Sequence, residues 1–302
     1  MYLELEQFYS DPKFSVVNQA AEERNNARVK PVDDFMRSIE QAPDHTNNPA
    51  DPAAMSCAYN AYRSWAEAGA LTGEPPTFNS EGALKRSSYL VGLNLLALKF
   101  KAAGYPLDQA ILGWLYTLNA KNVNFFEHGS NRGNLRVWSG AIAALHAVVD
   151  RDPIFRRYQD QVWHEAIAAI HDDGTIDAEM ARGARALIYH MFSLSATLVL
   201  HDARRALGYP DAPADMARLH LLIDTVGKTL CDPHRFDAPA HAAQEIPGDW
   251  AYRVPNGFGP DLLTADWTRC GMPKAALSDT TFGGDTSVSA AALKREGRPK
   301  QK

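Results

Sequence analysis

The chain has 302 residues, of which 45% are hydrophobic, and its formal net charge at pH 7 is −5. This size is sufficient for one large core or two modest ones, and because no linker divides the helical region we expect a single domain over residues 1–302. The acidic balance argues against nucleic acid as a partner. No apolar run is long enough to cross a bilayer, so we expect no membrane insertion. The N-terminal sequence also lacks the apolar segment of a signal peptide.

The three cysteines are too few for a disulfide scaffold and lack metal-ligand spacing. A disulfide between Cys231 and Cys270 is one interpretation. Buried free thiols are the interpretation that we favour for these two residues and Cys57. We expect no metal and no cofactor.

Residues 1–50 are polar and interrupted by Asn and Pro, which predicts short helices and a loop. We expect this segment to form an arm or lid. Its basic residues Arg24, Arg28 and Lys30 could then line a site, but a solvated surface is the interpretation that we favour for them.

Beyond residue 51 the apolar residues recur at helical spacing, and turn residues separate the segments. We expect helices over residues 52–71, 80–103, 106–121, 135–149, 154–170 and 215–230. The polar segment 122–134 is expected to be a loop. Period-2 alternation is almost absent, so the fold class is expected to be all-α, with helices that pack as antiparallel hairpins around a cleft.

The stretch 173–208 carries the most informative pattern. Asp177 is a plausible N-cap and Gly208 a plausible stop, which predicts one long helix between them. Side chains suited to holding an anion and moving a proton share one arc of this helix: Arg182, Arg185, Tyr189 and His190. After Cys231 the helical signal fades into an irregular cap, and residues 288–302 are expected to be a disordered basic tail.

Four segments together resemble the alginate lyase family of polysaccharide lyases: residues 56–100, 131–155, 172–194 and 250–287. The run Arg-Ala-Leu-Ile-Tyr-His at 185–190 is the most specific piece. The resemblance implies an incomplete α/α toroid, metal-free β-elimination of an acidic, uronate-containing polysaccharide, and a periplasmic or secreted location. Oligomeric state is not readable from the sequence.

β-Elimination explains which residue types such a site needs. Guanidinium or amide donors must neutralise the C5 carboxylate, so that the C5 proton becomes acidic. A base then removes that proton, and an acid protonates the departing glycosidic oxygen. His or Tyr side chains within hydrogen-bond reach can perform both transfers.

Two of the family's motifs are incomplete in this chain. The resemblance implies an Asn and a His ahead of a Trp; Asn134 and Trp138 are kept, but Leu135 occupies the His position. Near the C-terminus it implies a Tyr directly after a Pro. Pro255 is kept, but Asn256 follows it.

Three interpretations remain open. In a rewired lyase, proton transfer falls to Tyr189, His190, Tyr252 or His128, and neutralisation to Asn134, Arg132, Arg136 or Arg253. In the second, the alignment slips and Tyr252 is the catalytic tyrosine. In the third, the cleft binds an acidic glycan without cutting it. We expect the following residues to contact substrate: Arg182, Arg185, Arg132, Arg136, Arg253, Asn256, Trp250 and Lys85.

A different reaction class also uses helical toroids. Inverting glycoside hydrolases need two carboxylates across a cleft. Candidates are available, but no motif singles one out: Asp172, Asp173, Glu179, Asp249 and Asp266. A scaffold role in polysaccharide secretion is the third class of function.

Overall fold

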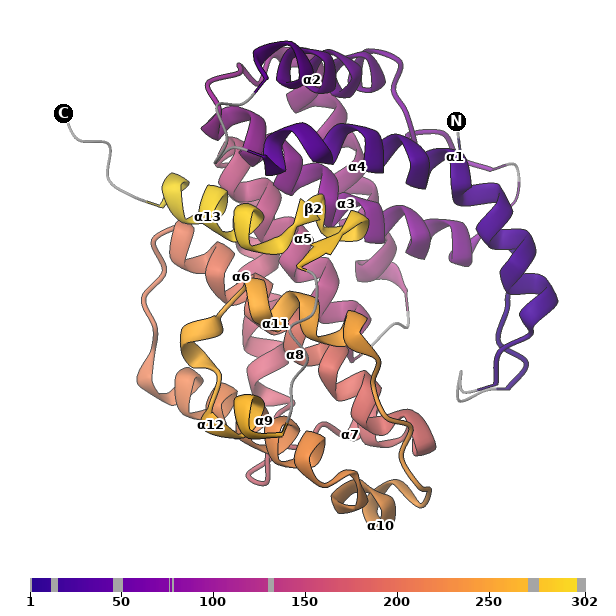
Figure 1. Cartoon of the computed structure of the whole chain (residues 1–302), viewed down its shortest axis with the longest axis vertical. Coiled ribbons are helices and arrows are strands. Elements are labelled where there is room, and N and C mark those ends of the chain that lie inside the picture. The colour runs from indigo at the N-terminus through magenta and orange to yellow at the C-terminus, as the bar shows by residue number, and fades with distance from the viewer. Residues whose placement is uncertain are drawn as a thin grey trace.

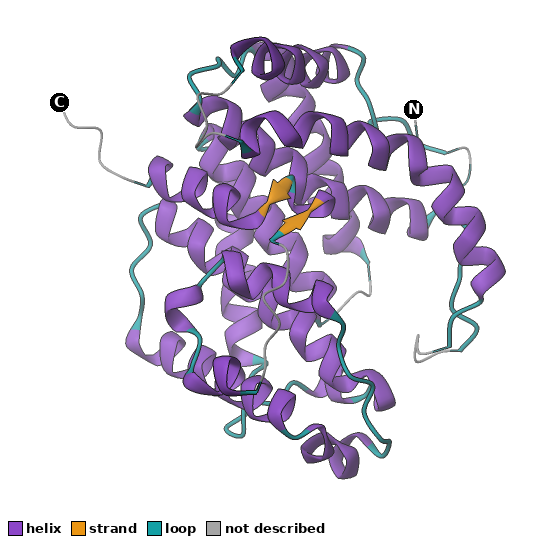
Figure 2. Ribbon diagram, viewed as in Figure 1, coloured by secondary structure: helices purple, strands orange, loops and turns teal. Residues whose placement is uncertain are grey.

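The computed structural model describes residues 2–11, 16–45, 51–75, 77, 79–129, 133–270 and 277–297. This part of the chain is helical almost throughout, which confirms the all-α prediction (Figure 2). The long helices are α1 (Gln19–Asp44), α2 (Pro52–Glu67), α3 (Ser80–Ala102), α4 (Gln109–His128), α5 (Asn134–Asp150), α6 (Pro153–Ala168), α8 (Ala186–Ala206), α9 (Pro213–Cys231) and α13 (Thr286–Glu296).

Short elements join these helices. They include α7 (Asp177–Met180), α10 (Asp237–Ala240), α11 (Arg253–Gly257) and α12 (Ala265–Arg269). The 3₁₀ turns are η1 (Gly183–Arg185), η2 (Pro233–Phe236), η3 (Asp249–Tyr252), η4 (Pro260–Leu262) and η5 (Thr280–Phe282). The strands β1 (Ser278–Asp279) and β2 (Gly284–Asp285) pair antiparallel, with Ser278 opposite Asp285.

Local sequence explains where several helices begin. Asp51 and Asp152 each cap a helix whose first residue is proline, and each carboxylate accepts an amide of the first turn. Asn79 and Asp108 cap α3 and α4 in the same way. These caps satisfy amides that have no partner inside the helix.

The centre of the molecule is built on α3, α5 and α8. Helix α5 packs against α3, α4, α6 and α8 (Figure 1). Gly140 allows α5 to approach α6 closely, because a Cβ there would meet Val162 Cγ1 at 2.4 Å. The segment Gly183–Ala206 is apolar and long enough to span a bilayer by composition, but 78% of its most apolar window is buried inside the protein. It is therefore the central core helix.

The helices of the N-terminal segment differ from those expected. One helix, α1, replaces two short ones and contains Pro31. Its inner face places Val32 and Met36 in the core. Arg24 and Arg28 both pair with Glu6, and Lys30 pairs with Asp34, so these cations do not line a site.

The central stretch is also not one helix from Asp177. Gly183 has a φ of 61°, a left-handed conformation that interrupts the helix between α7 and α8. Asp177 is the first residue of α7 rather than its cap, because Ile176 occupies the cap position. As a result, Arg182 and Arg185 precede α8, and only Tyr189 and His190 lie on it.

The C-terminal third returns over the helical body. Helix α13 packs against α3 and α8, and α11 also contacts α8 (Figure 1). The expectation of a disordered tail from residue 288 was wrong up to Glu296, which ends α13; residues 298–302 lie outside the described part. The preference for buried free thiols was also wrong, because Cys231 and Cys270 form a disulfide and Cys57 is exposed.

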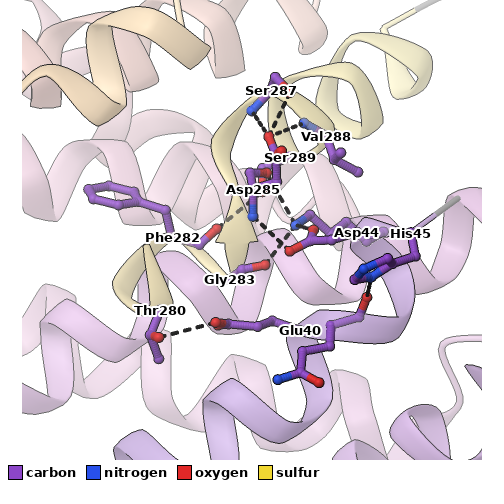
Figure 3. A network of polar contacts seen from close by, with 12 residues as sticks. Glu40, Asp44, His45, Thr280, Phe282, Gly283, Asp285, Ser287, Val288 and Ser289 are labelled. Carbon is purple, nitrogen blue, oxygen red and sulfur yellow. Dashed lines mark hydrogen bonds and ion pairs between the residues drawn. The ribbon is translucent and has the colours of Figure 1, made fainter. Parts of the chain in front are cut away.

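A buried polar network attaches this third to the end of α1 (Figure 3). The Lys99 ammonium bonds to Asp44 Oδ1 at 2.5 Å and to the Gly283 carbonyl at 2.6 Å. Asp44 Oδ2 accepts the Asp285 amide at 2.8 Å, and Thr280 donates to Glu40 Oε1 at 3.1 Å. The network thereby fixes η5 and β2 against α1 and α3.

Candidate functional site

Tyr189 stands between two arginines at the start of α8. The guanidinium carbons of Arg182 and Arg185 lie 4.5 and 5.5 Å from the centre of its ring. Burial and the hydroxyl of Tyr9 raise the pKa of Tyr189, while the two arginines act in the opposite direction. The phenol is therefore protonated at neutral pH, and cations flank it.

The N-terminal arm reaches this group through Tyr9. Side-chain hydrogen bonds with the Tyr9 hydroxyl, which accepts from the Arg185 guanidinium, contribute to the raised pKa values of both Tyr189 and Arg185. The backbone of the arm is held by a bridge between Tyr9 and Val17. Arg185 also lies 3.6 Å from a Glu245 carboxylate oxygen. Sequence analysis missed Tyr9, because a single Tyr in a polar segment carries no pattern.

A cavity of about 400 Å³ lies beside this cationic group, between α3, α5, α8, η3 and η5. Two stacked rings connect them: Tyr189 meets Phe192 edge-on at 5.7 Å, and Phe192 stacks on Trp250 at 5.1 Å. Both Phe192 and Trp250 line the cavity, as do Leu135 and Trp138. The side chain of Trp250 is 39% exposed.

His190 lies inside the core instead. Its side chain is 0% exposed, Nε2 accepts the Ile176 amide at 3.0 Å, and Nδ1 lies 2.8 Å from the Ala186 carbonyl. Nδ1 therefore carries the proton. Burial lowers the pKa of His190 to about 4. Because both ring nitrogens are occupied by backbone groups, this structure gives His190 a structural role rather than proton transfer.

Asn134 is enclosed in a second buried network. Its backbone amide donates to Glu179 Oε1 at 2.6 Å, and its side-chain amide donates to Glu179 Oε2 at 3.1 Å. Ser193 adds a bond of 2.8 Å to Oε1. Burial raises the pKa of Glu179, although these bonds oppose the effect. Asn134 is 4% exposed, and Glu179 rather than a cavity is its partner.

The remaining cationic candidates are separated from Tyr189. Arg136 donates to both oxygens of Glu165, at 2.8 and 3.1 Å. Arg253 pairs at 3.0 Å with Asp279, which lines the cavity. Arg132 lies outside the described residues. The ammonium of Lys85 sits 4.8 Å above the ring of Tyr89.

The other proton-transfer candidates also lie elsewhere. Tyr252 is 8% exposed and belongs to the hydrophobic core, where burial raises its pKa. Asn256 is half-buried on α11, and His128 is exposed at the end of α4. Among the expected site residues that the structure describes, Tyr189, Arg182 and Arg185 come together in one group. Within the same part of the chain, no cluster of three metal-ligating side chains is found.

The alginate lyase family model matches residues 78–236, which is more than half of the chain. The chain belongs to the alginate lyase family. The matched region contains α3 to α9 and therefore carries Tyr189 and both arginines beside it. The family expected from the four sequence segments is thus confirmed.

Curated proteins that are similar to this chain carry polysaccharide lyase or alginate lyase names. The chain is 26% identical over 246 residues to a polysaccharide lyase of Stenotrophomonas maltophilia, covering 78% of this chain and 72% of that protein. It is 25% identical over 239 residues to an alginate lyase of Pseudomonas syringae pv. tomato, covering 75% and 62%. The chain thus spans less than two thirds of the Pseudomonas enzyme.

Solved structures share the fold. A histidine-to-alanine variant of alginate lyase A1-III, complexed with a tetrasaccharide, superposes with a TM-score of 0.80 at 19% identity, over 96% of this chain and 83% of that one. A tyrosine-to-phenylalanine variant, also with a tetrasaccharide, gives a TM-score of 0.73 at 18% identity. The expected α/α toroid of the alginate lyase family is therefore confirmed.

Proposed function

We propose that this family member is a polysaccharide lyase that cleaves a uronate-containing polymer by β-elimination. The observation that carries the proposal is Tyr189 with Arg182 and Arg185 stacked over its ring, 4.5 and 5.5 Å away. A phenol can transfer protons, and guanidinium groups pair with carboxylates. The relatives' names, polysaccharide lyase and alginate lyase, support the same reaction class.

The proposed reaction consumes no water. The substrate loses its C5 proton, the C4–O bond breaks, and a double bond forms between C4 and C5. Arg182 and Arg185 stabilise the negative charge that develops on the carboxylate. In one step, the Tyr189 hydroxyl gives its own proton to the departing glycosidic oxygen while the same oxygen takes the C5 proton, so that the phenol ends in its starting form. Hydrogen bonding to Tyr9 orients the Tyr189 hydroxyl.

This assignment gives proton transfer to Tyr189 and charge stabilisation to the two arginines before α8. It gives neither role to the residues at the positions of the two incomplete motifs. Leu135 lines the cavity wall and has no proton to exchange. His190 and Asn134 keep their backbone and Glu179 partners. Trp250, stacked on Phe192, would support the sugar chain through its exposed face.

Ultraviolet absorbance of the new double bond tests the proposal. The wild-type protein is incubated separately with polymannuronate, polyguluronate, polyglucuronate and hyaluronan. The polymer whose product absorbs is then used to measure the variants. Tyr189→Phe is expected to lower kcat by about 10²–10⁴ because it removes the proton-transfer group. Arg182→Gln is expected to lower kcat/KM by about 10²–10³.

Tyr116→Phe is the matched control, since this tyrosine is 40% exposed on α4, away from the cavity. It should retain wild-type kcat. Full activity of Tyr189→Phe would refute the assigned role. Binding of a polyuronate without absorbance from any polymer would show a glycan-binding protein, and new reducing ends without absorbance would show a hydrolase.

We also propose a periplasmic or extracellular location. The Cys231–Cys270 disulfide supports it, because such bonds persist in oxidising compartments. Alkylation of the unreduced, denatured protein from each cell fraction should label Cys57 alone. Labelling of all three cysteines in protein taken from its native compartment would contradict the proposal.

A further inference from the structure

The cavity beside Tyr189 is apolar, although the proposed substrate is an acidic sugar chain. Its volume, about 400 Å³, is within the range of small-molecule sites. Aromatic rings form much of its wall: Phe126, Trp138, Phe192, Trp250 and Phe282. No Lys, Arg or His of the described chain lines it.

Four of the polar side chains on this wall already have partners. Ser87, Ser88 and Ser139 each donate to a carbonyl one turn earlier in their own helix, at 2.9, 2.7 and 2.8 Å. Asp279 is paired with Arg253 at 3.0 Å. A sugar carboxylate placed here would lie near another carboxylate without a cation of its own, which is costly. The cavity therefore suits a neutral, apolar group.

That group must belong to the same ligand as the anion. The Tyr189–Phe192–Trp250 ring contacts join the cationic end directly to the apolar cavity. We propose, building on the proposed lyase function, that the substrate is a uronate polymer with acyl esters on its hydroxyl groups. Arg182 and Arg185 hold a carboxylate, and the cavity holds the acyl chain. Ser195, also on the wall, donates to the ester carbonyl.

The size of the cavity favours acyl groups longer than acetyl. A two-carbon acetyl group would leave most of 400 Å³ unfilled. Each further methylene buried against apolar walls raises affinity about three- to fourfold. Affinity should therefore increase with acyl length until the cavity is full, and the increase should depend on cavity volume rather than on the two arginines.

Binding of acylated oligosaccharides tests this proposal. Mannuronate oligosaccharides of one length are prepared unsubstituted, acetylated or butanoylated to the same degree, and the Kd values are measured by calorimetry with Tyr189→Phe protein, so that nothing is cleaved. Butanoyl esters are expected to bind about tenfold more tightly than acetyl esters. Ser88→Phe should fill the cavity and abolish this difference.

Two further variants control the result. Ser38→Phe changes an exposed serine on α1 that also donates to its own helix, and it should keep the tenfold preference. Leu84→Trp fills the cavity from another wall residue of α3 if Ser88→Phe does not fold. Equal affinity for all three oligosaccharides, with cleavage of the polymer intact, would overturn this inference alone. Neither binding nor cleavage of any uronate would overturn the proposed function and this inference with it.

Discussion

At the scale of single residues, environment determines which polar side chains can act. Tyr189 and His190 are neighbours on α8, yet one lies between arginines and the other is enclosed by backbone. The sequence pattern identified both but could not separate them, because adjacent residues lie about 100° apart on a helix and the partners of each come from other segments. The order Arg, Arg, Tyr was sufficient to find the cationic group. Tyr9 was not predictable, because its contact joins segments about 180 residues apart.

His190 should make stability sensitive to acid. Its pKa is about 4 in the folded protein, below the ordinary value of 6.5. The unfolded chain therefore binds more protons between these values, and the free energy of unfolding should fall by about 2–3 kcal/mol as pH decreases from 6.5 to 4. Urea unfolding of wild type and His190→Gln across this pH range measures the decrease in the free energy of unfolding. We expect a smaller decrease for the variant.

His164→Gln is the matched control for this experiment, because the His164 side chain is 67% exposed on α6. The free energy of unfolding of this variant should depend on pH as that of the wild type does. If His190→Gln lost as much stability as wild type over the same range, the buried, neutral histidine would not be the source.

At the scale of elements, apolar periodicity predicted the long helices well, because each of them buries a stripe of its surface. It failed where tertiary packing overrides a local signal. Pro31 was expected to divide α1, but Val32 and Met36 pack in the core and keep one helix continuous. The short elements after Cys231 were beyond prediction, since their positions depend on η5, β2 and the disulfide rather than on periodicity.

The disulfide ties the end of α9 to α12. Cys231 and Cys270 are 39 residues apart in sequence, so the bond closes a long loop in the unfolded chain. Replacing both with serine should lower the free energy of unfolding by about 2–4 kcal/mol. Thermal denaturation would show a lower Tm. Reductant should lower the wild-type Tm in the same direction and leave the double variant unchanged.

Cys57→Ser serves as the control, because this thiol is exposed and unpaired with the other two cysteines. It should keep the wild-type Tm and the response to reductant. A double variant with wild-type Tm would mean that the bond contributes nothing to stability, and that α12 is held by packing such as that of Trp267.

At the scale of the whole molecule, the cavity depends on a connection between distant parts of the chain. Asp279, Thr281 and Phe282 line the cavity, and the β1–η5–β2 segment that carries them is held by α1 and Lys99. A Cβ on Gly284 would meet Asp44, so the close contact between β2 and α1 requires glycine at this position. The proposed site is thus assembled only when the C-terminal segment docks onto the N-terminal helix.

Glu40 makes this docking sensitive to pH. Burial, and the nearby Asp44 and Asp279, raise its pKa from 4.5 to about 7, against the hydrogen bond from Thr280 and the charge of Lys99. The folded protein therefore binds more protons than the unfolded chain between these values. The free energy of unfolding should fall by about 1–2 kcal/mol as pH rises from 4.5 to 7, after allowance for screening by water.

Glu40→Gln should remove this loss, because the amide keeps an acceptor for Thr280 without a buried charge. We expect the variant to be more stable than wild type at pH 8 and nearly equal at pH 4.5, as measured by urea unfolding. Glu23→Gln, on the exposed face of the same helix, controls for a change of net charge. If both variants shifted stability equally at pH 8, net charge would explain the gain. If only Glu40→Gln were more stable than wild type at pH 8, the loss of stability at higher pH would come from the contact between α1 and the segment that closes the cavity.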